Sequence, residues 1–369
     1  MHSSEIQTSL NVELAHARYP IHIGHHLETS LRAFIEDKHE SGHSVCVVTD
    51  KNFTEDQEAF VQGTFEGCPI LTLPAGETTK DAIYLERIYT FLAQNKMDRT
   101  GYLIAVGGGV IGDITGFAAA SFLRGIRFVQ VPTTLLAMVD SSVGGKTGIN
   151  IPEGKNLVGA FYQPASVFIS TKLLESLPNR EFSAGMAEVI KYGMLGNVEL
   201  FDRLESLDRL HATHPELPDV IRVCCQDKAN IVQADEKETA ASGGRALLNL
   251  GHTFAHAIEK VAGYGVYLHG EAVAIGLILA ARLSEKLGHI GKDVEERAVD
   301  LLVRYDLPVH MEKPLSTDKL IDAMQSDKKV HRGKLRFVVM HAMGESTTQG
   351  DIDESLVREI IESSRELPF

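Results

Sequence analysis

The chain has 369 residues and a formal net charge of −14 at pH 7. That balance argues against a general nucleic-acid binder, which needs a basic face, but a local group of Lys and Arg can still hold an anionic ligand. No stretch reaches the roughly 18 apolar residues of a membrane span, the N-terminus lacks an apolar secretion core, and the four cysteines form no CxxC pair, so a reduced, cytoplasmic location is expected.

The first half of the chain alternates β-branched runs with helical spacing. Strands are expected at residues 44–50, 102–109, 127–132 and 166–170, and helices at 80–94 and 112–123. This alternation is typical of βαβ units around a mostly parallel sheet.

Helical spacing dominates the second half, where one apolar run at 334–342 predicts a strand that needs a partner. Helices are expected at 180–195, 199–210, 217–234, 246–262, 270–288, 292–305, 315–326 and 351–364. Pro178 and Asn179 mark the change of pattern. We therefore expect an α/β nucleotide-binding domain over residues 1–179 and a mainly α-helical metal- and substrate-binding domain over 180–369. The cleft between two such domains is the default active site.

A glycine-rich segment follows the expected strand 102–109. It fits GxGxxG, and its residues are Gly107, Gly108, Gly109, Val110, Ile111 and Gly112. Such glycines let a backbone approach a pyrophosphate at the start of a helix. The acidic residue expected about 20 positions later is missing. A tight strand-to-helix turn without a ligand therefore remains an alternative.

Lysines accompanied by polar residues recur along the chain. The set is Asp140, Lys146, Lys155, Asn156, Lys191, Lys228, Arg245, Asn249 and the pair Lys328-Lys329. A single lysine is usually a solvated surface charge, whereas the set suits a substrate with both a phosphate and a carboxylate. The GGKT sequence is not a P-loop, because Asp140 stands where that motif requires its first glycine.

Three residues far apart in the sequence could form one metal site. They are Glu188 in AEVIKYG, His252 in NLGHTFAHAIE and His269 in LHGEAVAIG. Two imidazoles and a carboxylate suit zinc with an open position for substrate. The alternatives are core or capping histidines, and a surface ion pair between Glu188 and Lys191. His256 lies four residues after His252, but only His252 of this pair is expected to bind the metal.

Together these segments resemble the 3-dehydroquinate synthase family, from Asp50 to about Phe337. The resemblance implies NAD, zinc (or cobalt in its place), a homodimer and an anionic sugar phosphate substrate. The implied activity is conversion of 3-deoxy-D-arabino-heptulosonate 7-phosphate to 3-dehydroquinate and phosphate. It proceeds by transient oxidation, phosphate elimination, re-reduction and aldol closure, as a lyase step of the shikimate pathway to aromatic amino acids. Another sugar phosphate cyclase, or a metal-dependent polyol dehydrogenase that releases NADH, is the alternative.

The resemblance also assigns roles to residues. Glu188, His252 and His269 are the metal ligands. The NAD contacts are Asp50, Gly76, Glu77, Lys80, Gly107, Gly108, Gly109, Val110, Ile111, Gly112, Asp113, Thr133, Thr134, Lys146 and Lys155. The substrate contacts are Lys146, Asn156, Lys191, Lys228, Arg245, Asn249, His256 and Lys328, with Arg124 reaching the phosphate from the neighbouring subunit. The catalytic set is Asp140, Lys146, Lys191, Arg245, Asn249 and His256.

The sequence departs from the family pattern at a few positions. Ala75 and Ala255 replace the usual Asp and Gly, and Ala240 to Gly243 lengthen a loop. Glu271 is expected either to support a ligand or to cap its helix.

Overall fold

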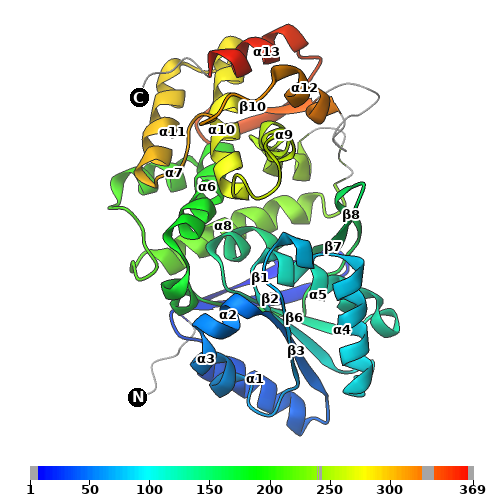
Figure 1. Ribbon diagram of the computed structural model, residues 1–369. Helices are drawn as coiled ribbons and strands as arrows, with labels where there is room; N and C mark the ends of the chain where they lie inside the picture. The colour runs from blue at the N-terminus through cyan, green and yellow to red at the C-terminus, as the bar shows by residue number, and fades with distance from the viewer. Residues whose placement is uncertain (1–6, 239, 241–242, 326–335, 365–369) are drawn as a thin grey trace. The chain divides into compact units, whose positions relative to one another are not determined.

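The computed structural model describes residues 7–238, 240, 243–325 and 336–364 (Figure 1). The described residues form two compact units. The first contains the chain up to Pro178 together with His211–Gln233, and the second contains Asn179–Leu210 and the chain from Ala234 onward. The chain thus returns to the first unit after leaving it, a crossing that the sequence did not predict.

The first unit is built on a seven-stranded sheet with the order β1-β2-β9-β6-β5-β3-β4 (Figure 1). Its strands are β1 (Thr8–Glu13), β2 (Arg18–Gly24), β3 (Val45–Asp50), β4 (Ile70–Leu73), β5 (Tyr102–Gly107), β6 (Arg127–Pro132) and β9 (Ser166–Ser170). All neighbouring strands are parallel except β1 and β2. From β3 the chain passes to β4 on one side and then to β5 on the other. In open α/β sheets, ligands bind outside the carboxyl ends of the strands at such a reversal.

Helices supply the other layers of this unit, and a small antiparallel hairpin is formed by β7 (Lys146–Ile151) and β8 (Gly154–Phe161). The helical segments are α1 (Glu28–Glu40), α2 (Lys51–Asp56), α3 (Glu58–Thr64), α4 (Ala82–Gln94), α5 (Gly109–Ser121), α8 (Leu217–Ala234), the short turns η1 (Glu77–Thr79), η2 (Phe122–Arg124) and η4 (Thr171–Ser176), and the π-helical turn η3 (Ala137–Ser141).

The sheet separates two apolar cores, because successive side chains of a strand point to opposite faces. Cys46 and Val48 of β3 pack in the core that includes α4 and α5. Val45 and Val47 pack in the core that includes α1 and α3. Burial on both faces explains why the central strands are continuous apolar runs.

The second unit is mainly helical. Its elements are α6 (Asn179–Gly196), α7 (Val198–Ser206), η5 (Gly244–Asn249), α9 (His252–Ala262), α10 (His269–Lys286), α11 (Lys292–Arg304), α12 (Thr317–Gln325), β10 (Arg336–Ala342), β11 (Glu345–Gly350) and α13 (Glu354–Ser363). Helix α10 is buried on all sides from Ala272 to Ala281 and packs against α6, α9, α11, α13 and β10, as a central helix must. The strand that needed a partner is β10, which pairs with β11; its first two expected positions lie outside the described residues.

Close backbone contacts hold α6, α9 and α10 together. A Cβ atom on Gly270 would lie 1.9 Å from the carbonyl oxygen of Ala184 in α6. A Cβ on Gly276 would lie 2.2 Å from the carbonyl oxygen of Gly251, at the start of α9. Only glycine permits such approaches. The glycines around the histidine motifs therefore set the spacing of these three helices.

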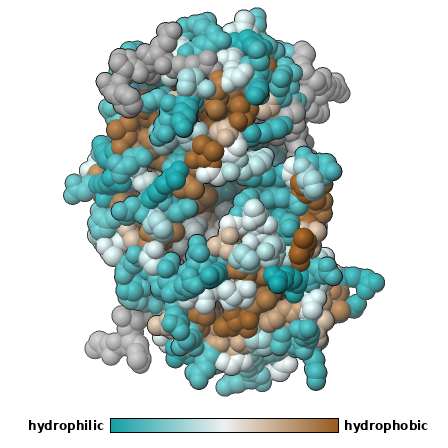
Figure 2. Space-filling model, in the orientation of Figure 1, coloured by the Kyte–Doolittle hydropathy of each residue, from teal (hydrophilic) through white to brown (hydrophobic). Residues whose placement is uncertain are grey.

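Most predicted elements are present, and the differences are local. Helix α9 begins at His252 rather than near residue 246, because Gly251 has a φ of 76° and a 3-10 turn precedes it. Strands β1, β2, β4, β7, β8 and β11 and helices α1, α2 and α3 were not predicted. No helix among the described residues is long and apolar enough to cross a membrane. The face seen in Figure 2 mixes hydrophilic and hydrophobic residues.

Candidate functional site

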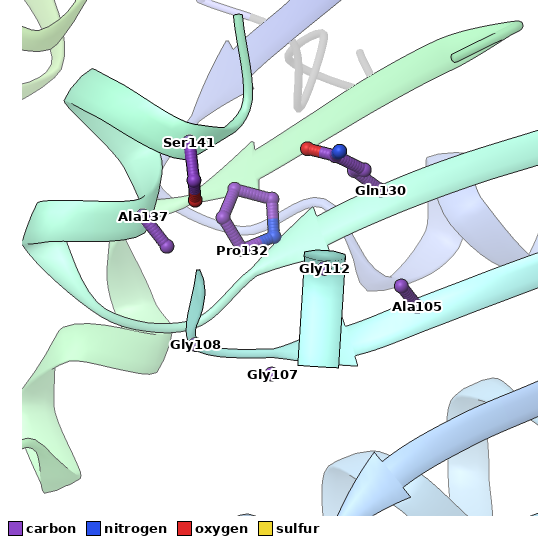
Figure 3. Close-up of a pocket in the computed structure, with 8 residues that line it drawn as sticks. All are labelled: Ala105, Gly107, Gly108, Gly112, Gln130, Pro132, Ala137 and Ser141. Carbon is purple, nitrogen blue, oxygen red and sulfur yellow. The ribbon is translucent and has the colours of Figure 1, made fainter. Parts of the chain in front are cut away.

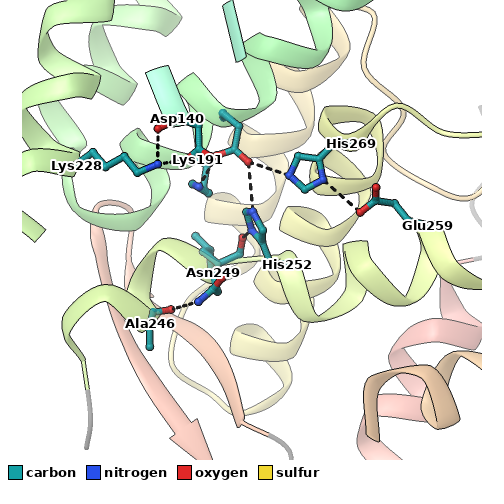
Figure 4. A network of polar contacts seen from close by, with 10 residues as sticks. Asp140, Lys191, Lys228, Ala246, Asn249, His252, Glu259 and His269 are labelled. Atoms are coloured by element: carbon teal, nitrogen blue, oxygen red, sulfur yellow. Dashed lines mark hydrogen bonds and ion pairs between the residues drawn. The ribbon is translucent and has the colours of Figure 1, made fainter. Parts of the chain in front are cut away.

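In the second unit, Glu188, His252 and His269 form a cluster whose ligand atoms all lie within 4.8 Å of one another (Figure 4). Glu188 Oε1 lies 3.3 Å from His252 Nε2 and 3.7 Å from His269 Nε2. Ligands 2.0–2.2 Å from a tetrahedral zinc ion are separated by about 3.3–3.6 Å. The separations of Glu188 from both histidines are therefore close to those expected around one small metal ion.

The hydrogen bonds of the two histidines fix which nitrogen faces Glu188. His252 Nδ1 lies 3.1 Å from the carbonyl oxygen of Leu250, and His269 Nδ1 lies 3.2 Å from Glu259 Oε2. Both partners can only accept, so each Nδ1 carries the proton. Each neutral ring then presents the Nε2 lone pair toward Glu188, as a metal ligand requires.

Glu188 is fully buried on α6, and so is Lys191 one turn later. The two form an ion pair. The alternative of a surface pair is therefore wrong, because α6 is buried on nearly all sides. Neither carboxylate oxygen has a well-directed hydrogen bond among the described residues. Lys191 offsets part of the cost of burying this anion, and a bound cation would offset more of it.

The charges in this cluster keep the ligands in their metal-binding forms. Burial raises the pKa of Glu188, but Lys191 and His252 lower it more, so the carboxyl pKa lies well below its usual range. Burial and then Lys191 lower the pKa of His252 to about 4. At neutral pH the carboxylate is therefore ionised and the imidazole of His252 is neutral.

Other residues predicted for the second unit lie on the same segments. The ring of His256 is 5.6 Å from that of His252 and 6.2 Å from that of His269, between centroids. Arg245 is buried in η5 and donates to the carbonyl oxygen of Glu236 at 2.8 Å. Asn249, at the end of η5, donates to the carbonyl oxygen of Ala246 at 3.2 Å. Lys328 lies outside the described residues, as does much of the lengthened loop at 240–243.

Two glutamates near the cluster have distinct roles: one was expected to cap its helix or support a ligand, and the other was not predicted. Glu271 caps α10, because its Oε2 accepts the Leu268 N–H at 2.8 Å, and it also pairs with Arg180. Glu259, which was not predicted as a site residue, is the carboxylate beside His269. Its position seven residues after His252 places both on one face of α9, a signal that was present in the sequence.

In the first unit, the glycine loop lies at the carboxyl end of β5 and lines a small pocket (Figure 3). The lining residues are Ala105, Gly107, Gly108, Gly112, Gln130, Pro132, Ala137 and Ser141, of which only the glycines were predicted. A Cβ on Gly112 would meet no atom within 4 Å. Packing therefore does not require glycine at position 112, and the missing side chain leaves room for a ligand.

Asp50 ends β3 directly beside this loop. A Cβ on Gly107 would lie 3.1 Å from Asp50 Oδ2. Asp50 Oδ1 accepts the Phe53 N–H at 3.0 Å and caps α2. Burial raises the pKa of Asp50, and that capping bond opposes the rise. The predicted glycine loop and the predicted acidic residue thus meet where the sheet order reverses.

A buried lysine connects the start of α5 to the β7–β8 hairpin. Lys80 pairs with Asp113 and also donates to Asn156 Oδ1. Burial raises the pKa of Asp113, and Lys80 opposes the rise. Nearby, Asn150 donates to Glu77 Oε1 at 2.7 Å, and Gly76, with a φ of 101°, precedes η1. Several predicted cofactor residues therefore form one polar network with Asn156.

Lys228 of α8 is buried and pairs with Asp140 in the π-helical turn η3 (Figure 4). Its ammonium lies 2.5 Å from Asp140 Oδ1 and 2.5 Å from the Asp140 carbonyl oxygen. π-Helical turns are rare and frequently occur at functional sites. The structure thus joins two residues predicted from segments 88 positions apart.

The remaining predicted residues of this unit are more dispersed. Lys146 begins β7 and Lys155 follows the hairpin turn, so the strand rise separates them by roughly 13 Å. Arg124 is exposed at the end of η2, with a φ of 68°. Thr133 is buried, Thr134 Oγ1 accepts the Ala137 N–H at 3.1 Å, Val110 is half-buried and Ile111 packs in the core.

Comparison with known families gives a consistent result along the chain. Residues 70–184 match the model for the 3-dehydroquinate synthase N-terminal region, and residues 185–330 match that for the C-terminal region. The chain belongs to the 3-dehydroquinate synthase family. A 3-dehydroquinate synthase from Opitutus terrae is 54% identical over 351 residues, which cover 95% of this chain and 97% of the relative. One from Shewanella halifaxensis is 44% identical, with coverage of 95% and 98%.

Solved structures with the same fold include other cyclases. A 2-deoxy-scyllo-inosose synthase complexed with carbaglucose-6-phosphate, NAD+ and Co2+ is 24% identical with a TM-score of 0.85, covering 97% of this chain and 100% of its own. A 2-epi-5-epi-valiolone synthase from Streptomyces hygroscopicus with NAD+ and Zn2+ bound is 23% identical, also at a TM-score of 0.85, covering 96% and 98%. The α/β plus helical fold expected for the 3-dehydroquinate synthase family is confirmed.

Proposed function

We propose that this chain converts 3-deoxy-D-arabino-heptulosonate 7-phosphate to 3-dehydroquinate and phosphate, as a lyase that uses NAD and one divalent metal ion. The observation that carries the proposal is the Glu188, His252 and His269 cluster in a chain 54% identical to a 3-dehydroquinate synthase over nearly its whole length. The cluster keeps the family's ligand set, which a catalytically silent relative has no need to retain.

NAD is proposed to bind at the carboxyl ends of β3 and β5. The amides that open α5 are available to a pyrophosphate, and the open side of Gly112 gives it room. Asp50 Oδ2 is the oxygen that the capping bond leaves for a ribose hydroxyl. When bound, NAD supplies a transient hydride acceptor.

Zinc, or cobalt in its place, is proposed to bind Glu188, His252 and His269. When bound, the metal acidifies a coordinated substrate hydroxyl. The neighbouring Lys191 keeps Glu188 ionised, and His256 lies close enough to both histidines to contact the same substrate and move a proton.

The cationic residues are proposed to bind the two anionic ends of the substrate. Lys228 and Arg245, with Asn249, would bind the carboxylate; Asp140 orients the Lys228 ammonium before substrate arrives. Lys146 and Asn156, with Lys328, would bind the phosphate. Substrates of the other cyclases lack the carboxylate, so this set favours the heptulosonate.

A homodimer in the cytoplasm is proposed as the working form. The exposed Arg124 would complete the phosphate site of the neighbouring subunit. The cysteines Cys46, Cys68, Cys224 and Cys225 are all free thiols, as a reduced compartment favours.

The test is phosphate release from the heptulosonate phosphate with catalytic NAD. We expect many turnovers without accumulation of NADH, abolition by a chelator, and recovery with zinc. NADH formed in proportion to turnover would indicate a polyol dehydrogenase instead. Turnover of only a carboxylate-free sugar phosphate would indicate another cyclase.

A further inference from the structure

Glu259 is a buried carboxylate that touches a proposed metal ligand without being one. It is 8% exposed, and its Oε2 lies 3.2 Å from His269 Nδ1 (Figure 4). A carboxylate is rarely buried unless it accepts a charged or strongly polar donor. The contact with the imidazole therefore has a role beyond filling space.

The two proposed histidine ligands are held in different ways. The His252 side chain is 12% exposed and donates to a neutral backbone carbonyl. The His269 side chain is 33% exposed and donates to a carboxylate. Packing constrains the more exposed ring less, so the hydrogen bond to Glu259 must supply more of its orientation. A carboxylate partner also makes an imidazole a stronger ligand than a neutral acceptor does.

Helix α9 is suited to this role because it carries both His252 and Glu259. The two lie two turns apart on one face, and the contact between Gly251 and Gly276 fixes α9 against α10, where His269 is the first residue. One helix thus contributes one ligand directly and orients the ring of another that a different helix carries.

We propose that Glu259 is a positioning residue that holds His269 in its Nε2-presenting tautomer and thereby sets the affinity of the metal site. This inference rests on the proposed metal site, and it assigns a role to a side chain that does not itself touch the metal.

The test compares zinc dissociation constants, measured by competition with a chromophoric chelator, for the wild type, Glu259→Gln and Glu259→Ala. Glu259→Ala is expected to weaken zinc binding about 10–100-fold. Glu259→Gln keeps an acceptor of the same size but loses the charge, so its loss should be smaller. Glu271→Gln is the matched control, because that carboxylate lies two residues after His269 but caps the helix; its zinc affinity should stay within about twofold of the wild type.

Two further measurements separate positioning from general damage. In a His269→Ala background, Glu259→Ala should have no additional effect on zinc affinity, because its partner is gone. The visible spectrum of the cobalt-loaded protein should change in Glu259→Ala and stay unchanged in Glu271→Gln. If Glu259→Ala does not fold, the isosteric Gln variant decides the matter through the same two measurements.

Wild-type zinc affinity in both Glu259 variants, or an equal loss with and without His269, would overturn the inference. If the wild type itself binds no divalent metal, the proposed metal site fails instead, and the two failures are distinguishable.

Discussion

The contact between α6 and α10 provides a sharp test of how the metal site is built. In Gly270→Ala, the new Cβ would lie 1.9 Å from the carbonyl oxygen of Ala184 and 2.6 Å from its Cα. An ordinary contact is about 3.4 Å or more, so α10 must move away from α6 by about 1.5 Å at this point. Metal ligands must be held to within about 0.5 Å. His269, the adjacent residue, would therefore be displaced from Glu188 by more than the site tolerates.

Two opposing effects decide the stability of this variant. Alanine favours a helix over glycine by about 1 kcal/mol. Overpacking costs about 1–3 kcal/mol and more where the obstacle is backbone, as it is here. We therefore expect a net loss of about 2 kcal/mol in the free energy of unfolding of the metal-free protein, measured with urea, and a zinc affinity at least tenfold weaker.

Gly196→Ala is the matched control for this change. Gly196 lies at the exposed end of α6, the helix that Gly270 of α10 contacts, and a Cβ on Gly196 would meet no atom within 4 Å. We expect wild-type zinc affinity and unchanged or slightly higher stability. If Gly270→Ala behaves like Gly196→Ala in both measurements, the contact between α6 and α10 does not position His269.

Three further predictions concern protonation, cofactor choice and assembly. His252 has a pKa of about 4 in the folded protein against 6.5 as its ordinary value. The unfolded chain therefore takes up this proton first, and the metal-free protein should lose stability as the pH falls from 6.5 toward 4. In His252→Gln the free energy of unfolding should fall less steeply between pH 6.5 and 4, as measured with urea in the presence of a chelator. An equal fall in both proteins would show that His252 does not cause the pH dependence. Asp50 should repel a 2′-phosphate, so activity with NADP should be far below that with NAD, and Asp50→Ala should weaken NAD binding in a direct titration. Comparable use of both cofactors would count against this role. Arg124→Ala should weaken substrate binding more than NAD binding, by about 1.5–3 kcal/mol. Mixing it with Lys155→Ala should restore some activity through hybrid dimers that contain one intact site; no recovery on subunit exchange, or a monomer in solution, would disprove the shared site.

The Glu188, His252 and His269 cluster could be predicted from the sequence because the three residues stand in long, specific motifs. The structure adds the residues that surround the three, among them Lys191 and Glu259. The burial of Lys191 could not be predicted, because it depends on the helices that pack around α6 rather than on the apolar spacing of α6 itself. Glu259 was missed for a related reason. The sequence spacing places Glu259 on the same face of α9 as His252. Its contact with His269, however, depends on how α10 packs against α9.

One pair of the missed strands has a clear physical reason for being missed. The β7–β8 hairpin is rich in glycine and largely exposed on β8, so it lacks the apolar alternation that indicates a half-buried strand. Its stability comes from pairing with a neighbouring strand, which the sequence of either strand alone does not reveal. The buried strands β3, β5 and β6 were predicted because they are nearly continuous runs of apolar residues.

The return of the chain to the first unit has a consequence for how the protein is made. Helix α8 carries Lys228, the partner of Asp140, and Cys225, whose thiol lies 3.3 Å from the Met138 carbonyl oxygen. On the ribosome, the sheet can begin to assemble once β9 has emerged, but η3 must wait for α8, which follows about 50 residues later in the sequence. At typical synthesis rates this is a delay of several seconds. A fragment that ends at Pro178 therefore contains every strand of the sheet and still leaves Asp140 without its lysine.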